Sequence, residues 1–272
     1  MSFEALSRRS FLSMSGFALL SACAAPKEVI VDDPHLPGYG AIYDSGYRLP
    51  AIPAEYTQGV NRRITGRYLG EQPIGTIDVD PYAKFLYFVR EGNNSVRFPI
   101  GVGRAGKAFA GNGTIQVKKK WPGWMPTKNM LRTEPEVYGP FARGIPGGKR
   151  SPLGARALYL YKGGRDTHYR IHGTNDWSSI GNSGSAGCIR MFNQDIIALY
   201  EMVPLGTSVH VRSEAESQRV DPENFGRGVD LPAKVIDPEL IYGDAAVADD
   251  HPPIFDDPRD GLSVDEGDVP LQ

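Results

Sequence analysis

Apolar and polar residues alternate along several short stretches in the middle of the chain, and turn residues separate these stretches. Such alternation over about four to eight residues is typical of a β-strand with one buried face. A β-prone run at residues 84–90 ends in a turn at residues 91–94, and residues 96–102 return, which predicts a hairpin. The other predicted strands are at residues 76–80, 114–118, 157–161, 169–172 and 208–211.

One stretch has the period of an amphipathic helix instead. Its first residue, Asn193, is a favourable N-cap, and Pro204 and Gly206 end it. Its apolar side chains share one stripe: Ile196, Leu199, Tyr200 and Val203. Many short strands with one main helix predict a mostly β fold, arranged as a β-sandwich or an open barrel.

The two ends of the chain show no sustained period. Residues 23–72 are rich in proline, glycine and polar residues, so we interpret them as a tether or linker. Residues 213–272 hold 16 acidic against 4 basic residues and are interrupted by prolines, so we expect an acidic tail that is disordered or loosely draped over the domain. One folded domain is therefore predicted, over residues 73–212.

The charge of the chain is unevenly distributed. The formal net charge is -2 and the pI is about 6.2, which argues against a strongly basic nucleic-acid binder, so no nucleic-acid partner is expected. Residues 23–212 hold 24 basic against 15 acidic residues. This mildly basic body suits an anionic polymer, and an ordinary solvated surface explains the same charge equally well.

Residues 1–22 are interpreted as an export signal. Arg8-Arg9, followed by Phe-Leu, resembles a twin-arginine signal, and the apolar run behind it is too short to span a bilayer. An ordinary positively charged signal region is the alternative. Leu20-Ser21-Ala22-Cys23 resembles a lipoprotein processing box that leaves Cys23 lipidated, and plain secretory cleavage is the alternative. We expect a protein of the periplasm or cell envelope, with a lipid anchor at Cys23 holding it to a membrane.

The two cysteines of the chain each need an explanation, because two are too few for a disulfide framework. If Cys23 is lipidated, Cys188 is the only free thiol. A thiol is mostly protonated at neutral pH, so a nucleophilic cysteine needs an imidazole to take its proton or to hold it as a thiolate and imidazolium pair. His172, at the end of a predicted strand, is the candidate. The amides of Gly187 and Cys188 are candidates for stabilising an oxyanion, since glycine permits tight backbone geometry.

Two segments together form a signature, namely His172-Gly173-Thr174-Asn175 and Ser185-Ala186-Gly187-Cys188-Ile189-Arg190. Three upstream segments add to it: Phe98 to Gly103, Lys120 to Thr127 and Ser151 to Gly154. With these features the sequence resembles the L,D-transpeptidase family with its YkuD-type catalytic domain, over about residues 75–212. The resemblance implies a YkuD-type β-sandwich or open barrel and a catalytic domain at residues 73–212.

By this resemblance, Cys188 attacks the carbonyl between the third residue of a peptidoglycan stem tetrapeptide and its terminal D-Ala, and forms a thioester. D-Ala leaves, and an amine of another stem then gives a 3-3 cross-link. His172 acts as the general base, and the backbone carbonyl of Gly173 orients it. No cofactor is implied. Many relatives carry a second histidine where this chain has Ala186, so the proton chemistry is left to His172.

Other acceptors and another class of protein remain open. A protein amine as acceptor would tether an outer-membrane protein to peptidoglycan, and water would give an L,D-carboxypeptidase. From a different class, a non-catalytic lipoprotein that binds peptidoglycan would use the same fold without turnover.

Five further residues are expected at the substrate-binding site. Arg190 binds a substrate carboxylate or forms an internal salt bridge. Ser185 and Thr174 are expected to hold the loop there by hydrogen bonds. Trp121 and Trp124 form a wall over the substrate or pack as ordinary core.

His168 precedes His172 by four residues on the same predicted strand. At about 3.3 Å per residue it lies roughly 13 Å from His172, so both cannot serve one sulfur, and we interpret His168 as structural. The spacing of histidines, cysteines and acidic residues predicts no metal site.

Overall fold

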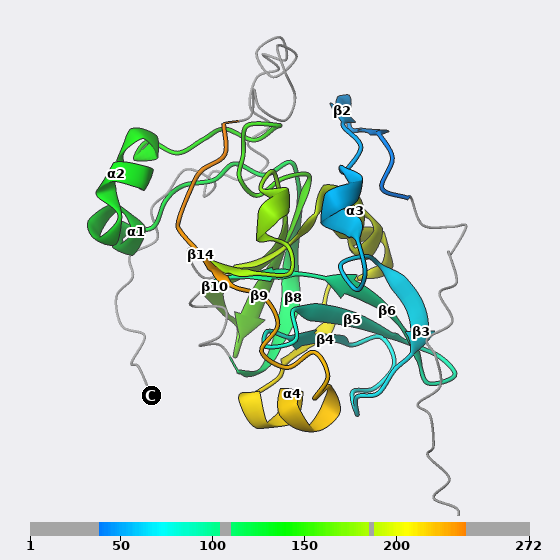
Figure 1. Cartoon of the computed structure of the whole chain (residues 1–272). Helices are drawn as coiled ribbons and strands as arrows, with labels where there is room; N and C mark the ends of the chain where they lie inside the picture. Colours follow the sequence, from blue (N-terminus) through cyan, green and yellow to red (C-terminus); the bar gives the residue numbers. More distant parts are fainter. Residues whose placement is uncertain (1–37, 104–109, 185–187, 238–272) are drawn as a thin grey trace, which may run out of the picture.

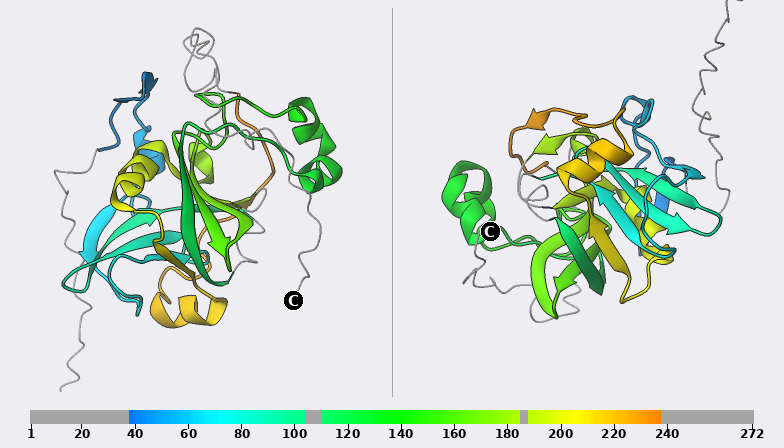
Figure 2. Two further views of the ribbon diagram at one scale, coloured as in Figure 1. Left: turned by 180° about the vertical axis from the view of Figure 1, so that it is seen from behind. Right: turned by 90° about the horizontal axis from the view of Figure 1, so that it is seen from below.

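The structure is a computed structural model and describes residues 38–103, 110–184 and 188–237. One long, bent sheet dominates it (Figure 1), with the strand order β14-β11-β7-β12-β10-β9-β8-β13-β4-β5-β6-β3. In Figures 1 and 2 the strands β4 to β6 run across the direction of β8 to β10, so the sheet folds over on itself. The predicted mostly β architecture is therefore confirmed.

The predicted strands are all present, with ends that differ by a few residues from the prediction. They are β4 (Ile77–Asp80), β5 (Phe85–Arg90), β6 (Asn94–Pro99), β8 (Gly111–Lys120), β9 (Arg156–Lys162), β10 (Arg165–Thr174) and β13 (Ser208–Val211). β5 and β6 form the predicted hairpin. Its turn has positive φ at Gly92 (68°) and Asn93 (59°), a backbone shape that glycine and asparagine adopt most readily.

Short strands that the sequence pattern did not predict complete the sheet. They are β3 (Ile64–Arg67), β11 (Ser183–Gly184), β12 (Ile189–Phe192) and β14 (Asp230–Leu231). The strand predicted at residues 96–102 is divided between β6 and the short β7 (Gly101–Val102). Strands of two to four residues contain too few alternations to be recognised by their period. Among them, β12 pairs in parallel with β10 and so places the segment after Cys188 beside the strand that carries His172.

The main core lies between the two parts of the folded sheet and under the helix α3 (Asn193–Met202). It is made by alternate residues of the strands and by the apolar stripe of the helix. Its buried members include Ile77, Val79, Leu86, Val96, Phe98, Ile115, Leu158, Leu160, Ile171, Ile189, Ile196 and Leu199. Because side chains alternate along a strand, the residues between these core positions point to the opposite face of the sheet.

The helix α3 is confirmed, but its first residue does not cap it. Asn193 is buried, and its Oδ1 accepts a hydrogen bond from the Ala155 amide at 2.9 Å. Its Nδ2 donates to the carbonyl of Thr174 at 3.2 Å. The predicted N-cap role is therefore wrong, because this amide bridges the segment before β9 to the end of β10. The helix is thereby fastened to the strand that carries His172.

Several shorter helices lie in the connections. They are η1 (Ala54–Thr57), α1 (Lys128–Thr133), α2 (Pro135–Tyr138), η3 (Gly139–Phe141), η4 (Trp177–Ser179) and α4 (Glu214–Val220). Among the described residues, no helix has the length and apolar character that crossing a membrane requires.

Part of the predicted tether belongs to the folded domain. Residues 38–72 include β3, which pairs with β6, and the ribbon formed by β1 (Ile42–Asp44) and β2 (Tyr47–Leu49). Aromatic side chains attach this segment: the Tyr39 ring lies 5.6 Å from that of Phe192, and the Tyr47 ring 4.6 Å from that of Trp121. The tether prediction is wrong for residues 38–72, because scattered aromatic residues bury area without any sequence period. Residues 23–37 lie outside the described part.

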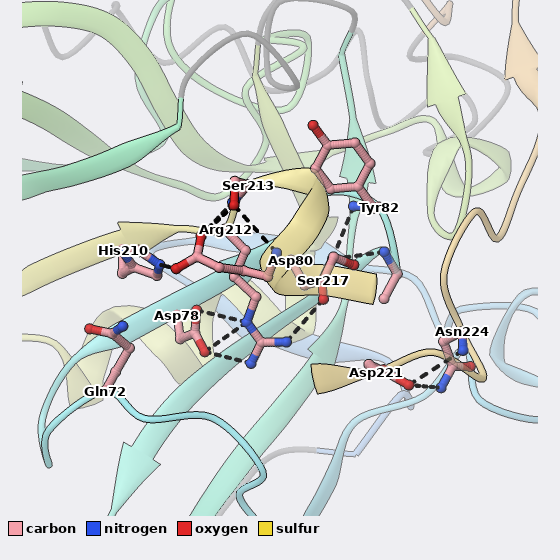
Figure 3. Close-up of polar contacts among 12 residues, drawn as sticks. Gln72, Asp78, Asp80, Tyr82, His210, Arg212, Ser213, Ser217, Asp221 and Asn224 are labelled. Atoms are coloured by element: carbon pink, nitrogen blue, oxygen red, sulfur yellow. Dashed lines mark hydrogen bonds and ion pairs between the residues drawn. The ribbon is translucent and has the colours of Figure 1, made fainter. Parts of the chain in front are cut away.

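Part of the predicted disordered tail is folded as well. The helix α4 starts with a capping box, in which Ser213 and Glu216 bond each other's backbone amides. Its Ser217 is buried and donates to Asp80 at 2.7 Å (Figure 3). Farther on, β14 pairs with β11. Polar anchoring of this kind does not depend on apolar content, so the prediction is wrong for residues 213–237, and residues 238–272 lie outside the described part.

A buried ion cluster joins this C-terminal segment to the sheet. The Arg212 guanidinium donates to Asp78 at 2.6 Å and to Asp80 at 2.9 Å, and all three side chains are almost fully buried (Figure 3). The Tyr68 hydroxyl donates to the same Asp78 carboxylate at 2.5 Å. A buried charge that loses its partner is costly, so this cluster holds β4 and the start of α4 together.

Replacing Arg212 by glutamine should lower the free energy of unfolding by about 3–5 kcal/mol, because two buried carboxylates lose their counter-charge. The matched control is Arg219→Gln, which removes an exposed ion pair with Glu71 and should change stability by about 1 kcal/mol or less. Urea unfolding followed by circular dichroism measures both. Equal effects of the two substitutions would show that the cluster does not stabilise the fold.

Candidate active site

The parallel pairing of β10 and β12 brings the two halves of the sequence signature together. Ile171 lies opposite Ile189, and His172 lies opposite Arg190. Cys188 directly precedes β12, and its carbonyl accepts from the Gly103 amide at 2.9 Å. Since side chains alternate, His172 and Arg190 project from the face opposite to the core residues Ile171 and Ile189. Cys188, two residues before Arg190, lies on the side of His172.

His172 is held in one orientation by its own strand. It is buried, with 4% of its surface exposed, and its Nδ1 lies 2.5 Å from the carbonyl oxygen of Gly173. A carbonyl can only accept, so Nδ1 carries the proton and Nε2 of the neutral ring keeps its lone pair. A side chain at position 173 would collide with Asn193 Oδ1, which explains the glycine. The predicted contact between His172 and the Gly173 carbonyl is thus present in the structure.

The burial of His172 and the partial burial of Cys188 favour the uncharged form of both reactive groups. Burial, and after it the charges of Arg190 and Arg170, lower the pKa of His172 to about 3, although hydrogen bonds to the carbonyls of Gly173 and Leu153 act in the opposite direction. Burial also raises the pKa of the Cys188 thiol, and the charges of Arg170 and Arg190 only partly offset it. Of the two charge states considered from the sequence, the resting site therefore favours a neutral thiol beside a neutral imidazole.

Both groups line one cavity of about 290 Å³. Its walls come from six parts of the chain: the sheet face of β9, β10 and β12, the segment after β8 at residues 123–127, the loop before β9, the loop after β10, the helices α1 and α2, and a C-terminal segment. In Figure 1 this last segment (orange) runs between α1 and α2 on one side and the strands on the other. Its contributions to the lining are Lys234, Val235 and Ile236. The lining combines apolar residues with many polar and charged ones, which suits a ligand that has both apolar and polar groups.

The two tryptophans have different environments. Trp124 lines the cavity, and its ring packs 6.2 Å from that of Tyr138. Trp121 does not line it: the ring packs against Tyr47, and its Nε1 donates to Asp44 at 2.7 Å. The wall role predicted for both residues agrees with the position of Trp124 only. Trp121 is a core residue under the β1 and β2 ribbon.

Arg190 and Thr174 both line the cavity. Arg190 donates to the Gly184 carbonyl at 3.2 Å and lies 3.9 Å from the Asp176 carboxylate. The same carboxylate pairs with Lys234 of the C-terminal segment at 3.1 Å. Thr174 accepts from the Asp176 amide at 3.0 Å and so shapes the loop. Arg190 thus forms the internal contact considered from the sequence and also lines the cavity.

Arg170 is a residue of this site that the sequence analysis did not identify. It lines the cavity, and it lies two residues before His172 on the same strand, which places it on the same sheet face. This alternation was visible in the sequence and would have identified it. Its guanidinium forms a two-bond pair with Asp166, with both distances at 2.7 Å.

The distance of about 13 Å expected between His168 and His172 requires a regular strand. In the structure, His168 lies in an irregular part of β10. The pairing of β9 with β10 shifts between Asp166 and Arg170, and His168 has a φ of 60°. This bulge turns the chain, and His168 lines the same cavity as His172. Spacing along an ideal strand therefore fails to place this residue.

Three predicted residues lie outside the described part of the chain: Ser185, Gly187 and the lipidation candidate Cys23. Within the described ranges, no group of three or more histidine, cysteine or acidic residues is arranged to hold a metal ion.

Comparisons with known proteins agree with this site. The family model of the L,D-transpeptidase catalytic domain, YkuD, matches residues 74–211. "Probable L,D-transpeptidase YbiS" of Escherichia coli K12 is 39% identical over 141 residues, which are 51% of this chain and 44% of that protein. "Putative L,D-transpeptidase YkuD" of Bacillus licheniformis is 52% identical over 66 residues, 24% of this chain and 36% of that protein. The chain thus spans less than half the length of these curated relatives.

A solved structure from Brucella melitensis, described as a probable carnitine operon oxidoreductase, shares 44% identity and covers 56% of this chain and 95% of its own. Its TM-score is 0.40, so the fold rests on the strand order and core packing of this chain and not on this match. The family model, in contrast, matches just over half of the 272 residues, including both His172 and Cys188. The chain therefore belongs to the family of the YkuD-type L,D-transpeptidase catalytic domain.

Proposed function

We propose that this protein is an L,D-transpeptidase of the cell wall in which Cys188 forms a thioester with a peptidoglycan stem tetrapeptide. The observation that supports this most is a single arrangement: Cys188 and His172 line one cavity from neighbouring parallel strands, and the Gly173 carbonyl fixes the His172 ring. Membership in the family adds the class of reaction and the class of substrate.

The proton chemistry follows from the neutral resting state. Since Nδ1 donates to the Gly173 carbonyl, Nε2 is the nitrogen that takes the thiol proton as the sulfur attacks. The imidazolium formed in this step is stabilised by the same carbonyl. A general base that acts only during attack fits a buried site better than a standing ion pair, because burial penalises both charges.

The acyl transfer then runs in two balanced halves. The Cys188 sulfur bonds to the carbonyl carbon before the terminal D-Ala, the C–N bond breaks, and His172 returns its proton to the departing D-Ala amine. An acceptor amine next attacks the thioester carbonyl and His172 takes a proton from that amine. The C–S bond then breaks, and His172 returns this proton to the Cys188 sulfur. The amides of Gly187 and Cys188 are proposed to bind the oxyanion in both halves.

Arg190 is proposed to bind a carboxylate of the stem peptide. It lines the cavity two residues after the nucleophile, and its internal partners are one carbonyl and a carboxylate at 3.9 Å. A guanidinium with donors to spare suits a carboxylate ligand. The proposed acceptor is the amine of a second stem peptide, which gives a 3-3 cross-link, while a protein amine or water would use the same thioester.

Export is part of the proposal and rests on the sequence of residues 1–23 alone. Substrate stem peptides lie outside the cytoplasm, so the enzyme has to reach the cell envelope. The twin-arginine-like pair and Cys23 provide a route and a lipid anchor for it.

Incubation with a stem tetrapeptide should add to the protein the mass of the tetrapeptide minus D-Ala, as seen by intact-mass spectrometry. Cys188→Ala should abolish this adduct, and His172→Gln should slow its formation by about 10²- to 10⁴-fold because the general base is lost. Cys23→Ser is the matched cysteine control and should leave it unchanged. An adduct that persists in Cys188→Ala would refute the assigned nucleophile.

The rate of alkylation of Cys188 by iodoacetamide should rise steadily between pH 6 and 9 without an acidic plateau. The sign follows from the two shifts: the raised pKa of the thiol keeps it protonated at neutral pH, and the lowered pKa of His172, about 3, keeps the ring neutral over this range. The measurement uses Cys23→Ser, so that one thiol reacts. A pH-independent rate from pH 5 to 7 would instead indicate a standing thiolate and imidazolium pair.

Removing the C-terminal wall should open the cavity to large reagents. A chain ending at Val229 lacks Lys234, Val235 and Ile236, whereas a chain ending at Asp237 keeps them. A bulky maleimide should label Cys188 faster in the shorter chain than in the longer one. The rate of labelling by the smaller iodoacetamide should differ less between the two chains. Equal maleimide rates would show that this segment does not limit access.

A further inference from the structure

A second guanidinium lies beside the nucleophile, and the proposed acyl-transfer steps assign it no task. In β9 and β10, Tyr159 lies opposite Arg170, and Ala157 lies opposite His172. Continuing the parallel register of β10 and β12 by one residue, from Ile171 opposite Ile189, places Arg170 opposite Cys188. Neighbouring strands are about 4.8 Å apart, so the two residues are direct neighbours on the cavity face.

The Arg170 side chain is fixed by contacts on several sides. Both of its terminal nitrogens donate to the Asp166 carboxylate at 2.7 Å, and Nη1 also donates to the Tyr169 carbonyl at 3.0 Å. Its guanidinium stacks over the Tyr159 ring at 4.1 Å. The bulge around His168 makes this possible, because it turns Asp166 back toward Arg170. The nitrogens of the Arg170 guanidinium are therefore occupied by internal contacts. Unlike the Arg190 guanidinium, this group is poorly suited to bind a substrate carboxylate.

We propose that Arg170 is a positioning residue, whose fixed positive charge stabilises the negative charge on the Cys188 sulfur whenever that sulfur is deprotonated. This deepens the proposed function and rests on it. Negative charge develops on the sulfur when the proton moves to His172, and again when the thioester is broken by the acceptor. A charge that is already in place needs no reorganisation at these moments.

Several other charged or titratable groups share this cavity or act on the sulfur. They are His172, His168 and Tyr169 on β10, Arg190 on β12, Tyr159 on β9, Tyr138 on α2, Asp176 in the loop after β10 and Lys234 in the C-terminal segment. Burial is the largest influence on the thiol and raises its pKa; among the influences that lower it, the charge of Arg170 comes first and that of Arg190 second. A backbone hydrogen bond from Arg170 acts in the same direction.

The test compares the pH profile of Cys188 alkylation in variants of the full chain with Cys23→Ser. Arg170→Gln should slow alkylation at pH 8 by about tenfold and move the profile to higher pH by about one unit. Arg170→Lys keeps a positive charge and should retain most of the rate. Arg165→Gln, at the exposed start of the same strand, is the matched control and should leave the profile unchanged.

Asp166→Asn separates electrostatics from structural support. The amide still accepts a hydrogen bond from Arg170, but the carboxylate that offsets the guanidinium charge is gone, so the alkylation profile should move to lower pH. A merely structural role would slow alkylation in both Asp166→Asn and Arg170→Gln. Near-ultraviolet circular dichroism confirms that each variant is folded, and if Arg170→Gln does not fold, the direction of the Asp166→Asn shift decides.

Opposite shifts in the two variants would establish the proposal, and an unchanged profile, or shifts in the same direction, would overturn it. Alkylation needs no peptidoglycan substrate. Failure of the parent chain to form a thioester with a stem peptide would therefore refute the proposed function without altering this result.

Discussion

The parallel pairing of β10 with β12 is the constraint on which the candidate site depends. These strands are separated by a long connection, and their register alone decides which side chains meet. With Ile171 opposite Ile189, one face of the pair joins the core and the other carries His172 and Arg190, with Cys188 beside them. A slip by one residue would turn the reactive side chains into the core and the isoleucines into the cavity. Burial of the two isoleucines therefore fixes the chemistry on the other face.

The packing around this site also affects the protonation states of Cys188 and His172. The imidazole is buried and the thiol is partly buried, and this raises the pKa of the thiol and lowers that of the ring, which favours keeping the proton on the sulfur until a substrate carbonyl is attacked. The backbone provides the orientation, through the Gly173 carbonyl, and the absence of a side chain there admits Asn193. Asn193 in turn ties α3 to the ends of two sheet segments. The packing of α3, the orientation of the His172 ring and the proposed proton transfer therefore all depend on the region around Gly173 and Asn193.

The sequence predicted the parts of the molecule that local patterns encode. Long alternating strands, the helix at Asn193 and the location of His172 and Cys188 at one cavity were accessible, because period and motif spacing express them directly. The folded portions of both ends were not, since isolated aromatic contacts and a buried ion cluster around Arg212 leave no period. Trp121 looked like a partner of Trp124, yet its place is set by Asp44 and Tyr47, which are distant in sequence. The bulge at His168 needs a positive φ that a strand pattern does not predict.

The charge state of His172 in the free protein tests the central claim most directly. Nitrogen-15 chemical shifts of its imidazole ring, assigned by comparison with His172→Gln, report whether the ring is neutral and which nitrogen carries the proton. We expect a neutral ring protonated on Nδ1 throughout pH 5 to 8. A positively charged ring at neutral pH that becomes neutral in Cys188→Ala would contradict this claim, because it would show a standing ion pair in a site that burial is expected to keep uncharged.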